Sequence, residues 1–168
     1  MKTKMVNENL LDAETRSKMA GRVEVLDKVK KLFLLPQLNM MTVEHVADYY
    51  NVDRDAINSC YYRNKEEIDL DGVEKRIAKS FFERDFHFEN HVKYRSHTDF
   101  QLSDGVILRV PNVGVRLFSK RAVLRIGMLL RDSVIAREVR TQLLNAFEKT
   151  DDGKKVEDIN TEQEAMGQ

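Results

Sequence analysis

The sequence predicts an α+β protein that is mainly helical, with an N-terminal helix-turn-helix followed by a small antiparallel sheet and two C-terminal helices. Residues 41–60, MTVEHVADYYNVDRDAINSC, have the pattern of a helix, a tight turn and a second helix. Residues 100–117 alternate apolar and polar side chains between turn signals, which is typical of antiparallel strands. From Lys120 to Phe147 the apolar residues recur at helical spacing.

Length and composition indicate a protein without a membrane segment. The chain has 168 residues, of which 42% are hydrophobic and 33% are charged, and this length suits one domain or two small ones. No run of about 18 apolar residues occurs, as a transmembrane helix would need, and the charged N-terminus lacks the apolar region of a signal peptide. Cys60 is the single cysteine and cannot form an intramolecular disulfide, which fits a cytoplasmic location.

The expected elements divide the chain into four parts. Residues 1–21 show weak periodicity and are expected to be a flexible N-terminus, mobile or loosely helical. Residues 22–72 form a helix-turn-helix domain, and residues 73–149 form an α+β module. We expect the acidic tail at 150–168 to be disordered, because so polar a segment has no means of burying itself.

The helix-turn-helix has an acceptable residue at every position. The helix that precedes it begins near Val23 and stops at Pro36, since proline lacks the backbone donor that a helix needs. Thr42 and Asp53 can cap the two helices of the motif, and Asn51 tolerates the left-handed backbone of the turn. The apolar residues expected to seal these helices together are Val46, Ala47, Tyr50, Val52, Ile57 and Cys60.

In the α+β module, residues 73–92 are expected to form a charged helix, and a small antiparallel sheet follows it. Ser119 can cap the next helix, KRAVLRIGMLL, which contains Gly127 as a close-packing point. The alternating apolar residues of the sheet are Phe100, Leu102, Val106, Leu108, Val110, Val113, Val115 and Leu117. The apolar stripe of the final helix is Ile135, Val139, Leu143 and Phe147.

The second helix of the motif has side chains suited to reading double-stranded DNA. Arg54, Asn58, Ser59 and Tyr62 point outward in this register and are expected to probe base edges; Arg54 suits guanine and Asn58 suits adenine. Asp55 opposes this interpretation, because a carboxylate repels phosphate unless it accepts from a cytosine amine. The residues expected to hold DNA phosphates are Thr42, Arg63, Lys65, Lys120, Arg121 and Arg125.

The charge distribution permits two interpretations. The formal net charge is zero, yet residues 105–145 contain eight basic and two acidic residues, a net charge of +6. Residues 150–168 contain two basic and six acidic residues, a net charge of −4. A basic module followed by an acidic tail indicates a polyanion-binding surface that the tail can shield. An ordinary solvated surface with a solubilising end has the same pattern.

Three histidines raise the question of a metal site. His87 and His91 are four residues apart, and His97, Asp85 or Glu89 would have to complete the ligand set. Surface or partly packed histidines explain the same pattern and are the interpretation we favour. No C-x-x-C, H-E-x-x-H, phosphate loop or nucleophile elbow is present, so we expect no enzyme activity, no cofactor and no metal.

Two longer stretches carry a family resemblance. They are LLPQLNMMTVEHVADYYNVDRDAINSCYYRNKEEIDLDGV and VRLFSKRAVLRIGMLLRDSVIAREVRTQLLNAFE. They resemble proteins of phages and prophages of Gram-positive bacteria that pair a helix-turn-helix with a strand and a similar helical pair. The second stretch is also distantly similar to Bro-N and related phage antirepressor domains. The resemblance covers about residues 30–148 and implies a cytosolic regulator or antirepressor without naming its ligand.

These features predict a DNA-binding transcriptional regulator or antirepressor that acts as a homodimer. One short recognition helix contacts few base pairs, and two-fold pairing doubles the site; the final helix or the helix at 22–35 would form the dimer seam. The alternative is a protein-binding inhibitor that captures a repressor or a host regulatory or defence protein and uses the helix-turn-helix as a scaffold.

Overall fold

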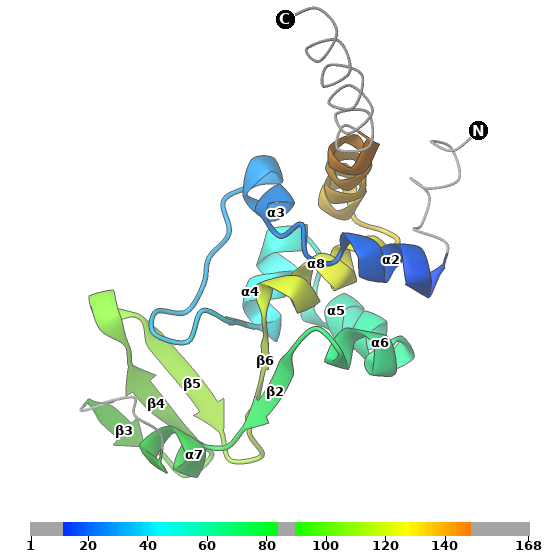
Figure 1. Ribbon diagram of the computed structural model, residues 1–168. Coiled ribbons are helices and arrows are strands. Elements are labelled where there is room, and N and C mark those ends of the chain that lie inside the picture. The colour runs from blue at the N-terminus through cyan, green and yellow to red at the C-terminus, as the bar shows by residue number, and fades with distance from the viewer. Residues whose placement is uncertain (1–11, 84–89, 149–168) are drawn as a thin grey trace, which may run out of the picture.

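The computed structural model describes residues 12–83 and 90–148, and its fold is α+β as the sequence predicts (Figure 1). Most helices gather on one side of the molecule, and a three-stranded sheet lies apart from them on the other. The helices are α2 (Ala13–Met19), α3 (Glu24–Val29), α4 (Val43–Tyr50), α5 (Arg54–Arg63), α6 (Lys65–Asp69), α7 (Ala78–Glu83), the 3-10 turn η1 (Ser103–Gly105) and α8 (Lys120–Leu129). A last helix, called the C-terminal helix below, covers 134–148.

Within the described residues the strands form two antiparallel sheets. The first has the order β1 (Met41–Thr42), β6 (Val115–Phe118), β2 (Val73–Arg76). The second has the order β3 (His91–Lys93), β4 (His97–Gln101), β5 (Ile107–Pro111). The central strand β6 joins distant parts of the chain, because Phe118 lies opposite both Met41 and Val73. The segment that connects β2 to β6 therefore carries the whole second sheet.

The larger apolar core is shared by the helix-turn-helix and the last two helices. It combines buried residues between Met19 and Ile68 with buried residues between Phe118 and Leu144. The predicted boundary after residue 72 therefore does not separate two cores. The smaller core lies against the second sheet; its buried members are Leu35, Phe81, Phe100, Leu102, Leu108, Val110, Val115 and Leu117.

Close packing of α4 against α8 confirms the predicted role of Gly127. A Cβ atom at Gly127 would overlap the hydroxyl of Tyr50 and lie 3.1 Å from its Cζ. The same hydroxyl donates to the carbonyl oxygen of Val123 at 2.6 Å. Arg140 of the C-terminal helix donates to the carbonyl oxygens of Gly127 and Leu130 at 2.9 and 2.8 Å. These hydrogen bonds hold the C-terminal helix against the end of α8.

Residues 73–92 do not form the single predicted helix. Residues 73–76 form β2, whose four residues all pair with β6 in register, and only Ala78–Glu83 are helical. The charged composition of this segment fits a helix, but long-range pairing with β6 satisfies the backbone of β2 instead. Residues 91–93 form β3, and residues 84–89 lie outside the described residues.

Three further expectations need correction. The helix expected to reach Pro36 ends at Val29, and Lys30 is extended with φ −163°. Its ammonium group is engaged elsewhere, donating to the carbonyl oxygens of Asp48 and Tyr49 at the end of α4. Val113, expected to face inward from a strand, is 75% exposed in the turn before β6. The expectation of a flexible N-terminus is wrong for its described part, because Ala13–Met19 form α2 and Met19 is buried in the larger core; residues 1–11 lie outside the described residues. The acidic tail at 150–168 also lies outside the described residues.

The helices in the described part of the chain lack either the length or the apolar composition that crossing a bilayer requires.

Candidate nucleic-acid interface

The helix-turn-helix forms as the sequence predicts. Thr42 caps α4, and its hydroxyl accepts from the backbone amide of His45 at 3.3 Å. Asn51 adopts the left-handed conformation, φ 60°, in the turn between the helices. Asp53 caps α5, and its carboxylate accepts from the amide of Ala56 at 2.8 Å. These local bonds fix where α5 begins and which of its faces points away from the core.

The inner face of α5 is anchored in the larger core through Ile57, Cys60 and Tyr61, which are all buried. Burial raises the pKa of the Cys60 thiol to about 11. The complete burial of Cys60 confirms it as a core residue, whereas a nucleophilic cysteine is typically exposed and has a lowered pKa. Tyr61 is held further by its hydroxyl, which donates to Asp69 at 2.6 Å.

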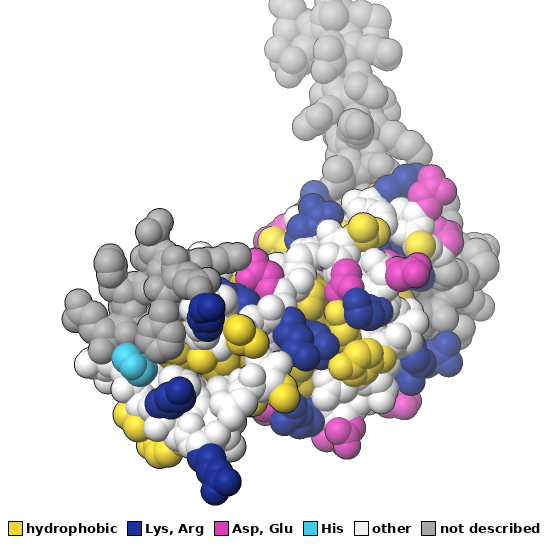
Figure 2. Space-filling model, turned by 90° about the horizontal axis from the view of Figure 1, so that it is seen from below, with side chains coloured by type: hydrophobic (Ala, Val, Ile, Leu, Met, Phe, Trp, Pro, Cys, Tyr) yellow, Lys and Arg dark blue, Asp and Glu magenta, His cyan; other side chains and the backbone are white. Residues whose placement is uncertain are grey.

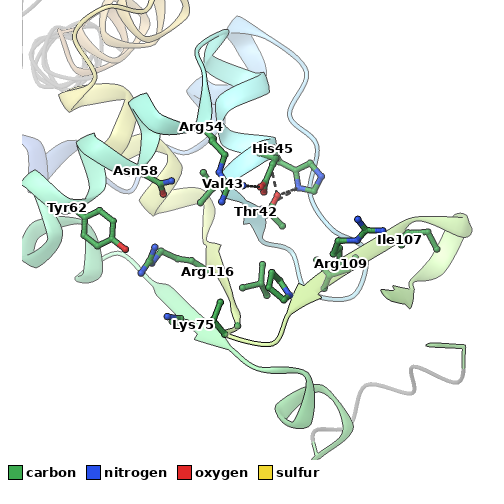
Figure 3. A pocket seen from close by; sticks show the side chains of 16 residues that line it. Thr42, Val43, His45, Arg54, Asn58, Tyr62, Lys75, Ile107, Arg109 and Arg116 are labelled. Atoms are coloured by element: carbon green, nitrogen blue, oxygen red, sulfur yellow. Dashed lines mark hydrogen bonds and ion pairs between the residues drawn. The ribbon is translucent and has the colours of Figure 1, made fainter. Parts of the chain in front are cut away.

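The outer face of α5 borders a groove of about 590 Å³, whose other side consists of strands (Figure 3). Arg54, Asn58 and Tyr62 are spaced by four residues and line this groove together, as expected for residues on one helical face. From β1 and the start of α4 come Thr42, Val43, Glu44 and His45; from β2, β5, β6 and their connections come Lys75, Ile107, Leu108, Arg109, Pro111, Val113, Gly114, Val115 and Arg116.

A second hollow, of about 410 Å³, borders α5 on another side. It is lined by Ser59 and Arg63 of α5 and by Arg131 from the connection after α8, together with Val52, Ala56, Leu130 and Asp132. The predicted base-reading residues are therefore divided. Three of them face the groove, whereas Ser59 lines the second hollow with the predicted phosphate ligand Arg63.

The groove is basic, but some of its cations are already paired. Arg54 forms an ion pair with Glu44 at 2.9 Å. Arg109 donates to both carboxylate oxygens of Asp99, at 3.0 and 3.2 Å, and these hydrogen bonds lower the pKa of Asp99. Seen from below, basic and apolar side chains are interspersed across the middle of the molecule (Figure 2).

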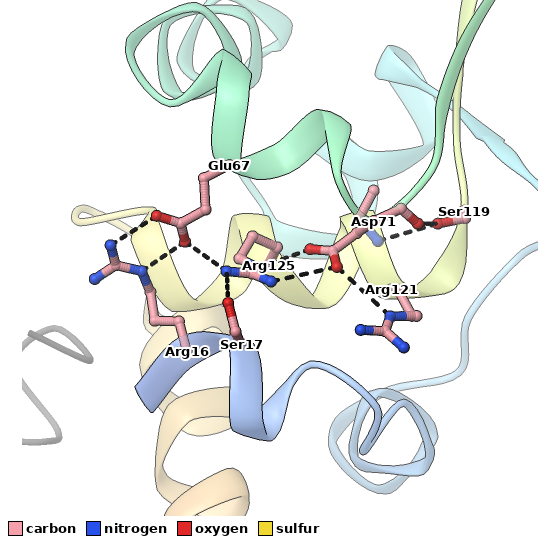
Figure 4. A network of polar contacts seen from close by, with 8 residues as sticks. Arg16, Ser17, Glu67, Asp71, Ser119, Arg121 and Arg125 are labelled. Atoms are coloured by element: carbon pink, nitrogen blue, oxygen red, sulfur yellow. Dashed lines mark hydrogen bonds and ion pairs between the residues drawn. The ribbon is translucent and has the colours of Figure 1, made fainter. Parts of the chain in front are cut away.

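The prediction that Arg125 holds a phosphate is wrong. Its side chain is 2% exposed and forms the centre of a buried polar network (Figure 4). Its guanidinium group donates to Asp71 at 2.7 and 3.3 Å, to Glu67 at 2.8 Å and to Ser17 at 3.3 Å. Arg16 binds the same Glu67 carboxylate through two hydrogen bonds. The amphipathic spacing of α8 did not reveal this network, because its carboxylates come from another segment.

The other expected phosphate ligands have different surroundings. Arg121 is half exposed and lies 3.5 Å from Asp71. Lys65 forms an ion pair with Asp69 at 2.8 Å, and neither Lys65, Arg121 nor Lys120 lines the groove or the second hollow. Thr42 lines the groove, but its hydroxyl is used as a helix cap. Of the basic residues counted between 105 and 145, Arg125 and Arg140 are buried and add nothing to the surface.

Sequence reasoning missed the basic residues of the strand side of the groove, Lys75, Arg109 and Arg116. Arg109 and Arg116 entered the regional charge count, but nothing placed them opposite α5. Lys75 falls within the helix predicted at 73–92, whereas it lies on β2. The alternation in VRLF could have indicated that Arg116 points away from the core, because it lies between the buried residues Val115 and Leu117.

The histidines do not form a metal site in the described part of the chain. His91 lies on β3 and His97 on β4, and the described residues contain no group of three His, Cys, Asp or Glu arranged to hold a metal ion. His87 lies outside the described residues. The Nδ1 atom of His97 is within 2.8 Å of the Ser96 hydroxyl, and its ring stacks on Tyr94.

Comparison of the chain with protein-family models, with curated protein sequences and with solved structures gives no match.

Proposed function

We propose that the protein is a DNA-binding transcriptional regulator that reads double-stranded DNA with α5. The observation that carries this proposal is the alignment of Arg54, Asn58 and Tyr62 along the groove, while the opposite face of α5 is fixed in the core. A guanidinium group, a carboxamide and a phenol at helical spacing have the donors and acceptors that recognise base edges. Tyr62 is 59% exposed, which a core role would not explain.

The surroundings of α5 support binding in the major groove. A helix in that groove has one phosphate strand on each side, and the groove is about 12 Å wide. α5 is bordered by basic residues on two sides: Lys75, Arg109 and Arg116 along the groove, and Arg63 and Arg131 along the second hollow. Cations on both sides of the helix can therefore hold the two strands while α5 contacts bases.

The ion pair of Arg54 with Glu44 does not prevent base contact. Both side chains are more than half exposed, and exposed ion pairs contribute little stability, about 0–1 kcal/mol. Replacing the Glu44 contact of Arg54 by a contact with a guanine edge therefore costs little free energy. Glu44 can also limit binding to sequences that offer Arg54 a better acceptor than its own carboxylate.

A selection from a random DNA pool, read by sequencing at two salt concentrations, tests this function. We expect enrichment of a two-fold symmetric motif, since the proposal includes a homodimer in the bacterial cytoplasm, and a steep loss of affinity with salt. Absence of any enriched motif, with no salt-dependent binding, would refute it. Capture of a repressor or host protein would then be the function to test.

A further inference from the structure

Lys75 and Arg116 form an unusual pair on the strand side of the groove. They lie directly opposite each other in the antiparallel pairing of β2 with β6, and both line the groove. Like charges placed directly opposite in a sheet are destabilising. Within residues 12–83 and 90–148, no carboxylate lies within ion-pair distance of either side chain. The nearby Asp69 carboxylate, whose pKa Arg116 helps to lower, offsets this repulsion only in part, because it forms no ion pair with Arg116.

The guanidinium group of Arg116 is held in place by aromatic rings. Its Cζ lies 4.6 Å from the ring centroid of Tyr61 and 5.2 Å from that of Tyr62. Figure 3 shows Arg116 pointing toward Tyr62. Tyr61 is itself fixed by burial and by its bond to Asp69. A cation above an aromatic ring is attracted through its charge, and this contact uses none of its N–H donors, which stay available to an acceptor. Arg116 is thus pre-positioned for an anion.

The other cations of the groove are less available. Arg54 is paired with Glu44, and Arg109 binds Asp99 through two hydrogen bonds. Lys75 and Arg116 are therefore where the groove has positive charge in excess. Exposed apolar side chains border the same space, namely Tyr62, Ile107 and Val113. Cations beside apolar surface fit a sugar-phosphate strand better than a small, fully hydrated anion.

We propose that Lys75 and Arg116 together bind one phosphodiester group of the DNA strand that passes between α5 and the strands. This inference rests on the proposed function, in which α5 occupies the major groove. Arg116 presents two parallel N–H donors to the phosphate oxygens, and Lys75 adds a point charge from the neighbouring strand. The single negative charge of the bound phosphate offsets the repulsion between these two cations.

Duplex binding by full-length variants tests the phosphate site. Arg116→Ala should weaken binding to a labelled mixed-sequence duplex about tenfold and reduce the slope of log affinity against log salt by about one. The matched control is Arg95→Ala, which removes the same charge from an exposed position between β3 and β4 that does not line the groove, and it should change affinity less than about twofold. Arg116→Lys should bind more tightly than Arg116→Ala but less tightly than the wild type, because lysine restores the positive charge without the two parallel N–H donors of arginine.

Lys75→Met is a second variant, which keeps the experiment decisive if loss of the contacts of Arg116 with Tyr61 and Tyr62 impairs folding. Lys75 is exposed, and Met retains its apolar stem. The double variant Arg116→Lys, Lys75→Met should lose less than the sum of the single losses, because both side chains hold one phosphate. Unchanged affinity and salt slope in Arg116→Ala and Lys75→Met would overturn the inference while the proposed function stands. Failure of the wild type to bind duplex would overturn both.

Discussion

Arg125 and Asp71 form a buried bidentate ion pair that ties α8 to the turn between α6 and β2. The two side chains are 2% and 1% exposed, and the Nε atom of Arg125 lies 2.7 Å from a carboxylate oxygen. Ser119, which caps α8, also donates to the backbone oxygen of Asp71. Because β2 begins two residues after Asp71 and carries Lys75, this pair fixes the strand side of the groove relative to the helices.

Arg125→Ala should lower the free energy of unfolding by about 3 kcal/mol, because it leaves the Asp71 carboxylate buried without its partner. Urea unfolding followed by circular dichroism measures this. Arg121→Ala is the matched control, since Arg121 lies 3.5 Å from the same carboxylate but is 53% exposed. Its loss should be under about 1 kcal/mol. Equal losses in the two variants would show that the buried pair is not the stabilising contact.

The stability of the network should depend on pH through Glu67. Burial acts to raise the pKa of Glu67, but the hydrogen bonds from Arg16 and Arg125 outweigh it and hold the pKa below its ordinary value. A carboxyl group with a lowered folded-state pKa contributes stability above its unfolded-state pKa, and this contribution is lost as the pH falls through the folded-state value.

We therefore expect the free energy of unfolding to decrease as the pH falls below about 4.5, the ordinary value for Glu67. Glu67→Gln should be less stable at neutral pH and should show a weaker pH dependence in the acidic range. Urea unfolding at several pH values measures both. Parallel stability curves for Glu67→Gln and the wild type would contradict the assignment.

Asn51 should show opposite effects for two small substitutions. Its left-handed backbone, φ 60°, is open to glycine but strained for alanine. Asn51→Gly should leave stability unchanged or raise it slightly, whereas Asn51→Ala should lower it by about 1 kcal/mol. Thermal unfolding of the two variants side by side measures the difference. A more stable alanine variant would mean that the turn does not have this conformation.

Gly127→Ala should destabilise the packing of α4 against α8 by about 1–3 kcal/mol, because the new methyl group overlaps Tyr50. Tyr50→Phe removes the overlapping hydroxyl, so the double variant should lose less than the two single losses combined. Additive losses in urea unfolding would indicate that Gly127 and Tyr50 do not meet as described.

Much of the fold follows from local sequence patterns. The caps at Thr42, Asp53 and Ser119 and the turn at Asn51 depend on neighbouring residues only, and the structure confirms each of them. The alternation around Leu108 and Val110 likewise predicts a half-buried strand. In all these cases a side chain satisfies its own backbone or follows the period of its own element.

The incorrect predictions concern contacts between distant segments. Arg125 lies on α8, which reads as an ordinary amphipathic helix, and its partners Glu67 and Asp71 are more than 50 residues away. β2 pairs with β6, and all three strands of the second sheet lie between them in the sequence. Without knowledge of this distant partner, the charged residues of β2 suggest a helix. The groove could be predicted only in part for the same reason. The sequence predicts α5 from local patterns, whereas Lys75 and Arg116 join the site only through the pairing of β2 with β6.

Base reading by the groove face of α5 can be tested with the DNA motif that Asn58→Ala selects from a random pool. Gln101→Ala, which removes an exposed carboxamide on β4 outside the groove, is the control and should select the wild-type motif. We predict that Asn58→Ala relaxes the preference at one position of each half-site, because one carboxamide contacts one base pair. An unchanged motif in Asn58→Ala, or equal weakening on every sequence, would contradict base reading by α5.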